Sequence, residues 1–186
     1  MEIDRTDEEL YTKFITEDDE DAMHILFEKY CESLTFFISG IVHNADDAEE
    51  IMMDCFAAVI AGSARYKARG GAGFKTWLYA VAKNNAYLFL RKNRITERLD
   101  EDEEKAADKI DIPENVLLKD EKNKELYKAL GRLSADQRMV LYLKCFEGMD
   151  TGQISQVMKK SIRQIYKLTD RGKNRLRDIL TAQEFL

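Results

Sequence analysis

The chain has 186 residues, of which 45% are hydrophobic and 34% are charged, and its formal net charge is -6. One proline, nine glycines and many Ala, Leu, Lys and Glu residues are typical of an all-helical protein of one or two small domains. The longest stretch without a formal charge, residues 33–45, is about half a membrane span, and the acidic N-terminus is unlike a signal peptide, so we expect a cytoplasmic protein.

The charges occur in blocks along the chain. Residues 1–64 have three bases and 17 acids, whereas residues 65–98 have nine bases and one acid. Residues 99–125 have five bases and 11 acids, and residues 126–186 have 12 bases and six acids. Two basic zones separated by an acidic one predict two contacts with one polyanion, or one polyanion and a second partner.

Apolar residues at spacings of three and four predict helices over residues 7–15 and 18–43. A third helix is predicted from about residue 46 toward 62, with acidic residues favourable in its first turn. Residues 63–73, SARYKARGGAG, form a basic loop, and an amphipathic helix over 74–94 follows it. We expect this helix to carry a basic face with aromatic side chains at its edge.

The second half of the chain begins with an acid-rich segment, residues 99–122, which Pro113 interrupts. We interpret it as a tethering linker between a first domain, residues 1–98, and a second, residues 123–186. Further helices are predicted near residues 123–132, 135–147, 151–158 and 162–180. The last three begin with capping pairs, Ser134 with Gln137, Asp150 with Gln153 and Ser161 with Gln164. Gly148 ends the helix near residues 135–147.

Residues 150–177 are typical of a DNA-reading helix-turn-helix, with eight bases and two acids in an acidic protein. In the second helix, Ile162, Ile165, Leu168 and Leu176 fit an inward face. The N-terminal turns of such a helix contact the edges of DNA bases, and the remaining Lys and Arg side chains suit the DNA phosphates. A solvated amphipathic helix, with Gln164 serving only as a cap, is the alternative. The DNA-contact candidates are Lys159, Lys160, Arg163, Gln164, Tyr166, Lys167, Arg171 and Lys173.

A second set of basic and aromatic residues lies in the loop and helix from residue 65 to 91. Basic residues interleaved with aromatic rings suit a single strand whose bases are unstacked. Trp77 lies in an apolar stripe, which favours core packing over base stacking. The candidates in this segment are Arg65, Lys67, Arg69, Lys75, Lys83, Asn84, Tyr87 and Arg91.

Catalytic and metal chemistry have little support in the sequence. Cys31, Cys55 and Cys145 lie far apart within apolar helical patterns, so each is interpreted as a buried structural thiol. His24 and His43 lack ligand partners at metal-binding spacing. The glycines of RGGAGF, residues 69–74, lack the lysine that ends a phosphate-binding loop. We therefore expect no cofactor and no enzyme activity.

Four segments in order, residues 46–56, 74–92, 133–155 and 161–176, resemble the extracytoplasmic-function sigma factors, two-domain members of the sigma-70 family. The resemblance implies an all-helical, two-domain protein that binds core RNA polymerase. It implies recognition of a minus-35 promoter element by residues 133–177. It also implies capture of a melted minus-10 element by residues 65–92, with an extruded base in the 63–73 loop.

The acidic start of the third helix matches the family's polymerase-docking segment, whose counterpart binds the clamp helices of the large polymerase subunit. Asp47, Glu50, Met53 and Asp54 are therefore the polymerase-contact candidates, and a merely acidic helix start is the alternative. The family also implies a linker that threads near the polymerase active-site cleft, although a solvated charge run fits these residues equally. An anti-sigma protein that clamps the two domains is a further possible partner.

The sequence departs from the family pattern at three positions. Met53 stands where the family commonly has Gln, Leu88 where it often has Asp, and Gly172 where Ala is usual. Gly172 predicts a less rigid distal part of the recognition helix. Two other functions are compatible with the motifs: a dimeric helix-turn-helix regulator that acts without polymerase, and a sigma-like protein that docks on polymerase but has lost promoter use.

Overall fold

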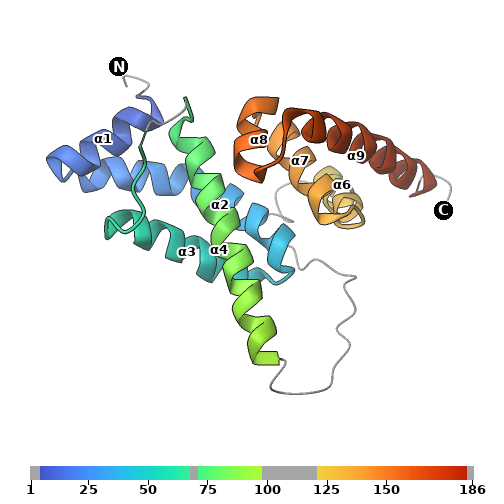
Figure 1. Ribbon diagram of the computed structural model, residues 1–186, viewed down its shortest axis with the longest axis horizontal. Coiled ribbons are helices and arrows are strands. Elements are labelled where there is room, and N and C mark those ends of the chain that lie inside the picture. Colours follow the sequence, from blue (N-terminus) through green and yellow to red (C-terminus); the bar gives the residue numbers. More distant parts are fainter. Residues whose placement is uncertain (1–4, 68–70, 98–120, 184–186) are drawn as a thin grey trace.

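The computed structural model describes residues 5–67, 71–97 and 121–183, and every regular element within them is an α-helix. No helix in these ranges is long and apolar enough to cross a membrane. Figure 1 shows the arrangement. The helices are α1 (Asp7–Glu17), α2 (Glu20–Val42), α3 (Ala45–Ile60), α4 (Phe74–Glu97), α6 (Glu121–Gly131), α7 (Ala135–Cys145), α8 (Thr151–Met158) and α9 (Ile162–Gln183).

Side-chain caps fix where most of these helices begin. Asp19 and Asn44 accept hydrogen bonds from the N–H groups of Ala22 and Asp47 at 3.0 and 2.9 Å. Such caps satisfy N–H groups that have no partner within the helix. The capping pairs predicted from the sequence are confirmed at α7, α8 and α9, where the backbone N–H of the capping residue donates to Gln137, Gln153 and Gln164.

Helices α1 to α4 form an N-terminal group built around α2. Helix α2 packs against α1, α3 and α4, and its Leu26, Leu34 and Ile38 are fully buried. Phe74 and Leu78 of α4 are also fully buried. The helix boundaries agree with those expected from the hydrophobic periodicity to within a few residues.

Helices α6 to α9 form a C-terminal group in which α7 packs mainly against α9. Gly172, in the middle of α9, lies against Leu141 of α7, and a Cβ atom at Gly172 would be 3.3 Å from the Leu141 Cγ. Helix α9 continues without interruption through Gly172 to Gln183. The missing side chain of Gly172 allows close approach of the two helices at this position.

The two groups of helices pack directly against each other. Helix α4 lies beside α8, and α2 contacts α7 (Figure 1). The predicted linker lies outside the described residues up to residue 120, and α6 begins at Glu121, two residues before the expected boundary.

The three cysteines occupy different environments. Cys55 is buried, and burial raises the pKa of its thiol to about 11. Cys31 is half-buried and Cys145 is exposed at the end of α7. The expectation of a buried thiol is confirmed for Cys55 and is wrong for Cys145. A three- to four-residue apolar period does not say which helix flank a neighbouring helix will cover.

Substitution of Gly172 tests its packing against α7. In an open helix, Gly172→Ala would stabilise the protein by about 1 kcal/mol; because Leu141 is buried and crowds the new methyl group, we expect a smaller gain or a loss. Gly172→Leu should cost about 2 kcal/mol or more through overpacking. Urea unfolding measures both, with exposed Asn174→Ala as the control. A full 1 kcal/mol gain for Gly172→Ala would contradict the close contact.

Candidate nucleic-acid interface

The helix-turn-helix consists of α8, a tight turn and α9. Asp150 caps α8 by accepting from the Gln153 N–H at 2.8 Å. Lys159 ends α8 in the left-handed conformation, with φ of 53°. Ser155 then closes the turn, because its hydroxyl donates to the Lys160 carbonyl at 2.6 Å. These local bonds set the direction in which α9 leaves the turn.

One face of α9 is packed and the other is open. Ile165 is buried, and Leu168 and Leu176 pack against the core as expected. Ile162, the first residue of α9, is 52% exposed, so its predicted inward position is wrong. The exposed face carries the predicted DNA contacts Arg163, Tyr166, Lys167, Arg171 and Lys173.

Gln164 has a structural role at the start of α9. Its amide oxygen accepts from the Ser161 N–H at 2.8 Å and from the Ser161 hydroxyl at 3.0 Å. The predicted capping pair of Ser161 with Gln164 is therefore confirmed. The side chain is exposed, but its acceptor oxygen is engaged, which leaves the amide N–H groups as the atoms suited to a base contact.

The basic residues expected to hold a melted strand divide into exposed and covered sets. Arg69 lies outside the described residues. Lys75 is paired with Glu147 of the C-terminal group and is one-third exposed, and Lys83 is only 8% exposed. They do not form an open face in this arrangement, contrary to the expectation from the sequence. The exposed members are Arg65, Lys67, Asn84, Tyr87 and Arg91.

Lys75 pairs with Glu147, from the loop between α7 and α8. The Lys75 Nζ is 2.9 Å from Glu147 Oε2 and donates to the Glu147 carbonyl at 2.7 Å. The Glu147 side chain is 8% exposed. Burial, with this carboxylate among the further causes, raises the pKa values of the Tyr79 and Tyr142 hydroxyls well above the ordinary value. Glu147 is therefore the charged centre of the contact between the two groups.

A second cluster of cations lies where α4 meets the helix-turn-helix. Burial lowers the pKa of Lys83, and the nearby charges of Lys159 and Lys160 lower it further. Lys160 pairs with Asp136 at 3.0 Å. Two candidate DNA-binding sets thus meet at this contact, and like charges there oppose it.

Arg138 of α7 adds another buried cation to the same contact. It is 8% exposed, and its side chain donates to the Gly131 carbonyl at 3.1 Å. The Arg138 Nε has no hydrogen-bond partner among the residues that the structure describes, and burial lowers the pKa of this guanidinium to about 10. An unpaired buried donor weakens the packing of the two groups.

An aromatic seam joins the two groups and was not found from the sequence. The Tyr142 hydroxyl of α7 donates to the Ser33 carbonyl of α2 at 2.9 Å. The Phe36 ring lies 4.5 and 5.0 Å from the Tyr127 and Tyr142 rings. The rings are visible in the sequence as apolar positions, but no pattern within one helix says that their partners lie about 100 residues away.

The predicted polymerase contacts lie on α3. Glu50, Met53 and Asp54 are exposed, and Asp47 is half-buried beside the Asn44 cap. Met53 is 54% exposed, and Ile60, seven residues further along the same helix, is 57% exposed. Ile60 was missed from the sequence, although two apolar residues seven positions apart lie on one helix face. The result is an acidic surface with two apolar side chains.

Within the described residues, no group of three or more His, Cys, Asp or Glu side chains could hold a metal ion. His24 pairs with Glu28 on the surface of α2. Burial, followed by the charge of Arg138, lowers the pKa of His43.

Comparison with known proteins finds two matches in order along the chain. The model of Sigma-70 region 2 matches residues 26–95, and that of Sigma-70, region 4 matches residues 123–176. The chain is 30% identical to the RNA polymerase sigma-H factor of Pseudomonas aeruginosa, covering 76% of this chain and 77% of that one. It is 24% identical to the ECF RNA polymerase sigma factor SigX of Bacillus subtilis, covering 85% and 83%.

Two solved structures share the fold. CnrH in complex with the cytosolic domain of CnrY has a TM-score of 0.62 at 16% identity, covering 93% of this chain and 96% of that one. The sigma factor RpoE from Bartonella quintana, in complex with the anti-sigma factor NepR, has a TM-score of 0.64 at 21% identity, covering 89% and 98%.

The Lys75–Glu147 pair can be tested by removing one charge. Lys75→Met leaves a mostly buried carboxylate unpaired, which should weaken the contact between the two groups by about 1–3 kcal/mol, since Lys75 is itself one-third exposed. Small-angle scattering should show a larger radius of gyration with unchanged helix content. Adding Glu147→Gln should recover part of the compaction, and exposed Lys67→Met is the control. An unchanged radius for Lys75→Met would contradict a stabilising role.

Proposed function

The chain belongs to the sigma-70 family as an extracytoplasmic-function sigma factor, and from this premise we propose how its surfaces divide the work of promoter recognition. It binds core RNA polymerase and directs promoter-specific transcription initiation. Sigma factors are non-enzymatic initiation factors, so the chemistry of RNA synthesis belongs to the polymerase. The observation that carries the proposal is an exposed basic face of α9 within the region 4 match, which follows the region 2 match along the chain.

The proposed minus-35 contact is the exposed face of α9. Arg163 and Lys167, one turn apart near its N-terminus, suit base edges in the major groove. Lys159, Arg171 and Lys173 flank them and suit phosphates on either side. Lys160 pairs with Asp136 in the closed arrangement and would exchange this carboxylate for a phosphate when DNA binds.

The proposed minus-10 contact is the basic loop with the exposed edge of α4. Arg65 and Lys67 precede the loop tip, while Asn84, Tyr87 and Arg91 continue along α4. Tyr87 is 39% exposed, so its ring can stack on an unpaired base. Lys75 and Lys83 join this surface only if the C-terminal group of helices moves away.

The proposed polymerase contact is the exposed face of α3. Glu50 and Asp54 provide negative charge for a basic partner surface, and Met53 provides an adaptable apolar anchor. Ile60 extends the apolar part of this surface. Helix α3 lies apart from α8 and α9 (Figure 1), so polymerase docking and minus-35 reading are proposed for different parts of the molecule.

The packed arrangement is proposed as a closed resting form. It covers Lys75 and Lys83 and engages Lys160. It also places buried cations close together, and phosphate binding would relieve the electrostatic repulsion between them. Polymerase and promoter DNA would therefore favour separation of the two groups, and an anti-sigma partner would favour the closed form. We place this activity in the cytoplasm, where polymerase and chromosome meet.

Initiation by holoenzyme tests the proposal. The protein is mixed with bacterial core polymerase, and initiation is measured on a random-sequence promoter library. Arg163→Ala and Lys167→Ala should each lower initiation about 10- to 100-fold, because a good base contact contributes about 1–3 kcal/mol, and should leave polymerase binding unchanged. Asp54→Lys should abolish polymerase binding.

Two matched variants control for charge alone. Arg177→Ala removes a base from the distal part of α9, and Glu28→Lys reverses an exposed acid on α2; neither should change initiation by more than a few-fold. Polymerase binding without initiation at any promoter would instead favour a sigma-like protein that has lost promoter use. Tight binding of the free protein as a dimer to a palindrome would favour a regulator.

A further inference from the structure

A small cavity lies at the contact between the two groups of helices, where α2 faces α7. Its volume is about 20 Å³, and four residues of α2 and three of α7 line it. The rings of Phe36, Phe37 and Tyr142 belong to this lining, and Arg138 is the one charged side chain in it. A water molecule needs about 10–15 Å³ of such space. The cavity is therefore suited to a single water molecule or a single monatomic ion.

Arg138 brings an unpaired, buried donor to this cavity. Its side chain is 8% exposed, and its Nε has no hydrogen-bond partner among the described residues. A Cβ atom placed on Gly40 would be 3.7 Å from the Arg138 Nε, so this N–H lies against a glycine that lines the same cavity. An unsatisfied buried donor is costly, and an acceptor in the cavity would remove that cost.

The Arg138 guanidinium also carries a charge that no carboxylate balances in the part of the chain that the structure describes. Its Nη1 donates to the Gly131 carbonyl at 3.1 Å. This carbonyl ends α6 and supplies only a partial negative charge. Asp136, the acid closest to Arg138 along the chain, pairs instead with Lys160 at 3.0 Å. A buried charge without an opposite charge is strongly destabilising, which favours an anion over a water molecule.

The other titratable groups around Arg138 supply no negative charge. Burial, and then the charge of Arg138, lowers the pKa of His43 at the end of α2. Burial raises the pKa of Tyr87 on α4, where the charges of Lys160 and Arg138 act in the opposite direction. Both side chains are therefore neutral at neutral pH. The field at this contact between α2, α4 and α7 remains positive, and it attracts an anion from solution.

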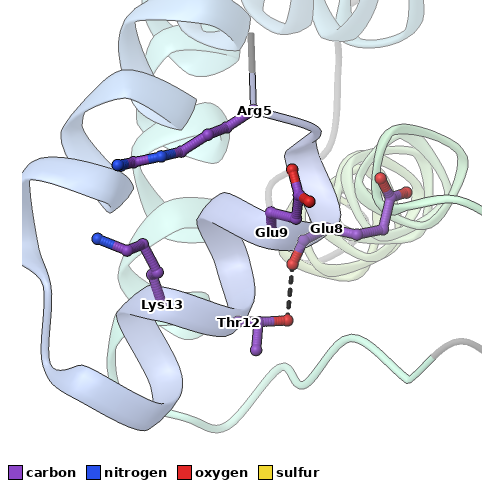
Figure 2. Close-up of a pocket in the computed structure, with 5 residues that line it drawn as sticks. All are labelled: Arg5, Glu8, Glu9, Thr12 and Lys13. Carbon is purple, nitrogen blue, oxygen red and sulfur yellow. Dashed lines mark hydrogen bonds between the residues drawn. The ribbon is translucent and has the colours of Figure 1, made fainter. Parts of the chain in front are cut away.

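A larger hollow on α1 shows the contrast. Its volume is about 460 Å³, and it lies along one side of α1 (Figure 2). Acids and bases line it together: Arg5, Glu8, Glu9, Thr12 and Lys13. Glu8 Oε1 accepts from the Phe74 N–H at 2.7 Å, and the Lys13 Nζ is 3.0 Å from Asp19 Oδ2. Mixed charge with partners inside the protein gives this hollow no preference for an ion of either sign.

We propose that the cavity between α2 and α7 binds one monatomic anion of the size of chloride against the Arg138 Nε. The anion accepts the Nε–H and is otherwise surrounded by aromatic and apolar side chains of both groups of helices. Because it contacts α2 and α7 at once, its binding stabilises the packed arrangement. This site goes beyond the proposed function, since it involves neither polymerase nor promoter DNA.

Thermal unfolding of the full chain tests the site. Sodium gluconate, whose anion is too large for the cavity, is replaced stepwise by sodium chloride at constant ionic strength. The unfolding midpoint of the wild-type protein should rise with chloride and level off. The rise should be about 3–6 °C at about ten times the dissociation constant. Saturation separates binding at one site from a general salt effect, which does not level off.

Two substitutions remove the site in different ways. Arg138→Met removes the donor and its charge, and Gly40→Ala places a methyl group in the cavity at ordinary contact distance from Arg138. Both variants should keep the helix content and lose the saturable response to chloride. Arg132→Met removes an exposed arginine close by in the sequence and should respond like the wild-type protein.

A crystal of the protein grown in sodium bromide locates the ion. Anomalous diffraction at the bromine edge should give a peak within hydrogen-bond distance of the Arg138 Nε. A wild-type midpoint without a saturable response would overturn the proposal, as would a response that persists in either Arg138→Met or Gly40→Ala. Density without an anomalous signal would assign the cavity to water alone and would also overturn it. None of these results bears on promoter recognition, which is tested separately with polymerase.

Discussion

The arrangement of this molecule depends on how its cations are neutralised in the absence of DNA. Glu147 supplies a nearly buried carboxylate to Lys75, and Asp136 supplies a half-exposed one to Lys160. Lys83 and Arg138 are buried close by with less compensation. Partly compensated charge of this kind can hold two groups of helices together and still release them, because a phosphate is as good a partner as a carboxylate.

Two parts of the fold are held in place by different kinds of interaction. The contact between the two groups contains the ion pairs Lys75–Glu147 and Lys160–Asp136, whose cations can exchange a carboxylate for another anion. In the N-terminal group, by contrast, the Phe74 N–H donates to Glu8 and the Tyr66 N–H donates to the Tyr11 hydroxyl. Both hydrogen bonds lie within the N-terminal group of helices, so they do not depend on the contact between the two groups.

Much of the fold could be predicted because its signals are local. The apolar period gave the helices, and the pairs Asp150 with Gln153 and Ser161 with Gln164 gave the helix starts. Long-range partners carry no such signal. Lys75 was predicted to contact a melted DNA strand, but in the structure it pairs with Glu147, 72 residues away. Gly172 is a similar case, since helix propensity describes an isolated helix and the contact with Leu141 decides its effect. Glu8 was overlooked because an acid in a helix start has an ordinary explanation.

The central claim is that one chain contacts two promoter elements through two separate surfaces. Photo-crosslinking tests it most directly, with a benzophenone side chain placed at Tyr87 on α4 or at Tyr166 on α9, both exposed. In holoenzyme on a matched promoter, the probe at Tyr87 should crosslink to the non-template strand of the minus-10 element, and the probe at Tyr166 to the minus-35 element. Crosslinking of both probes to the same element, or of neither to DNA while initiation proceeds, would contradict the account.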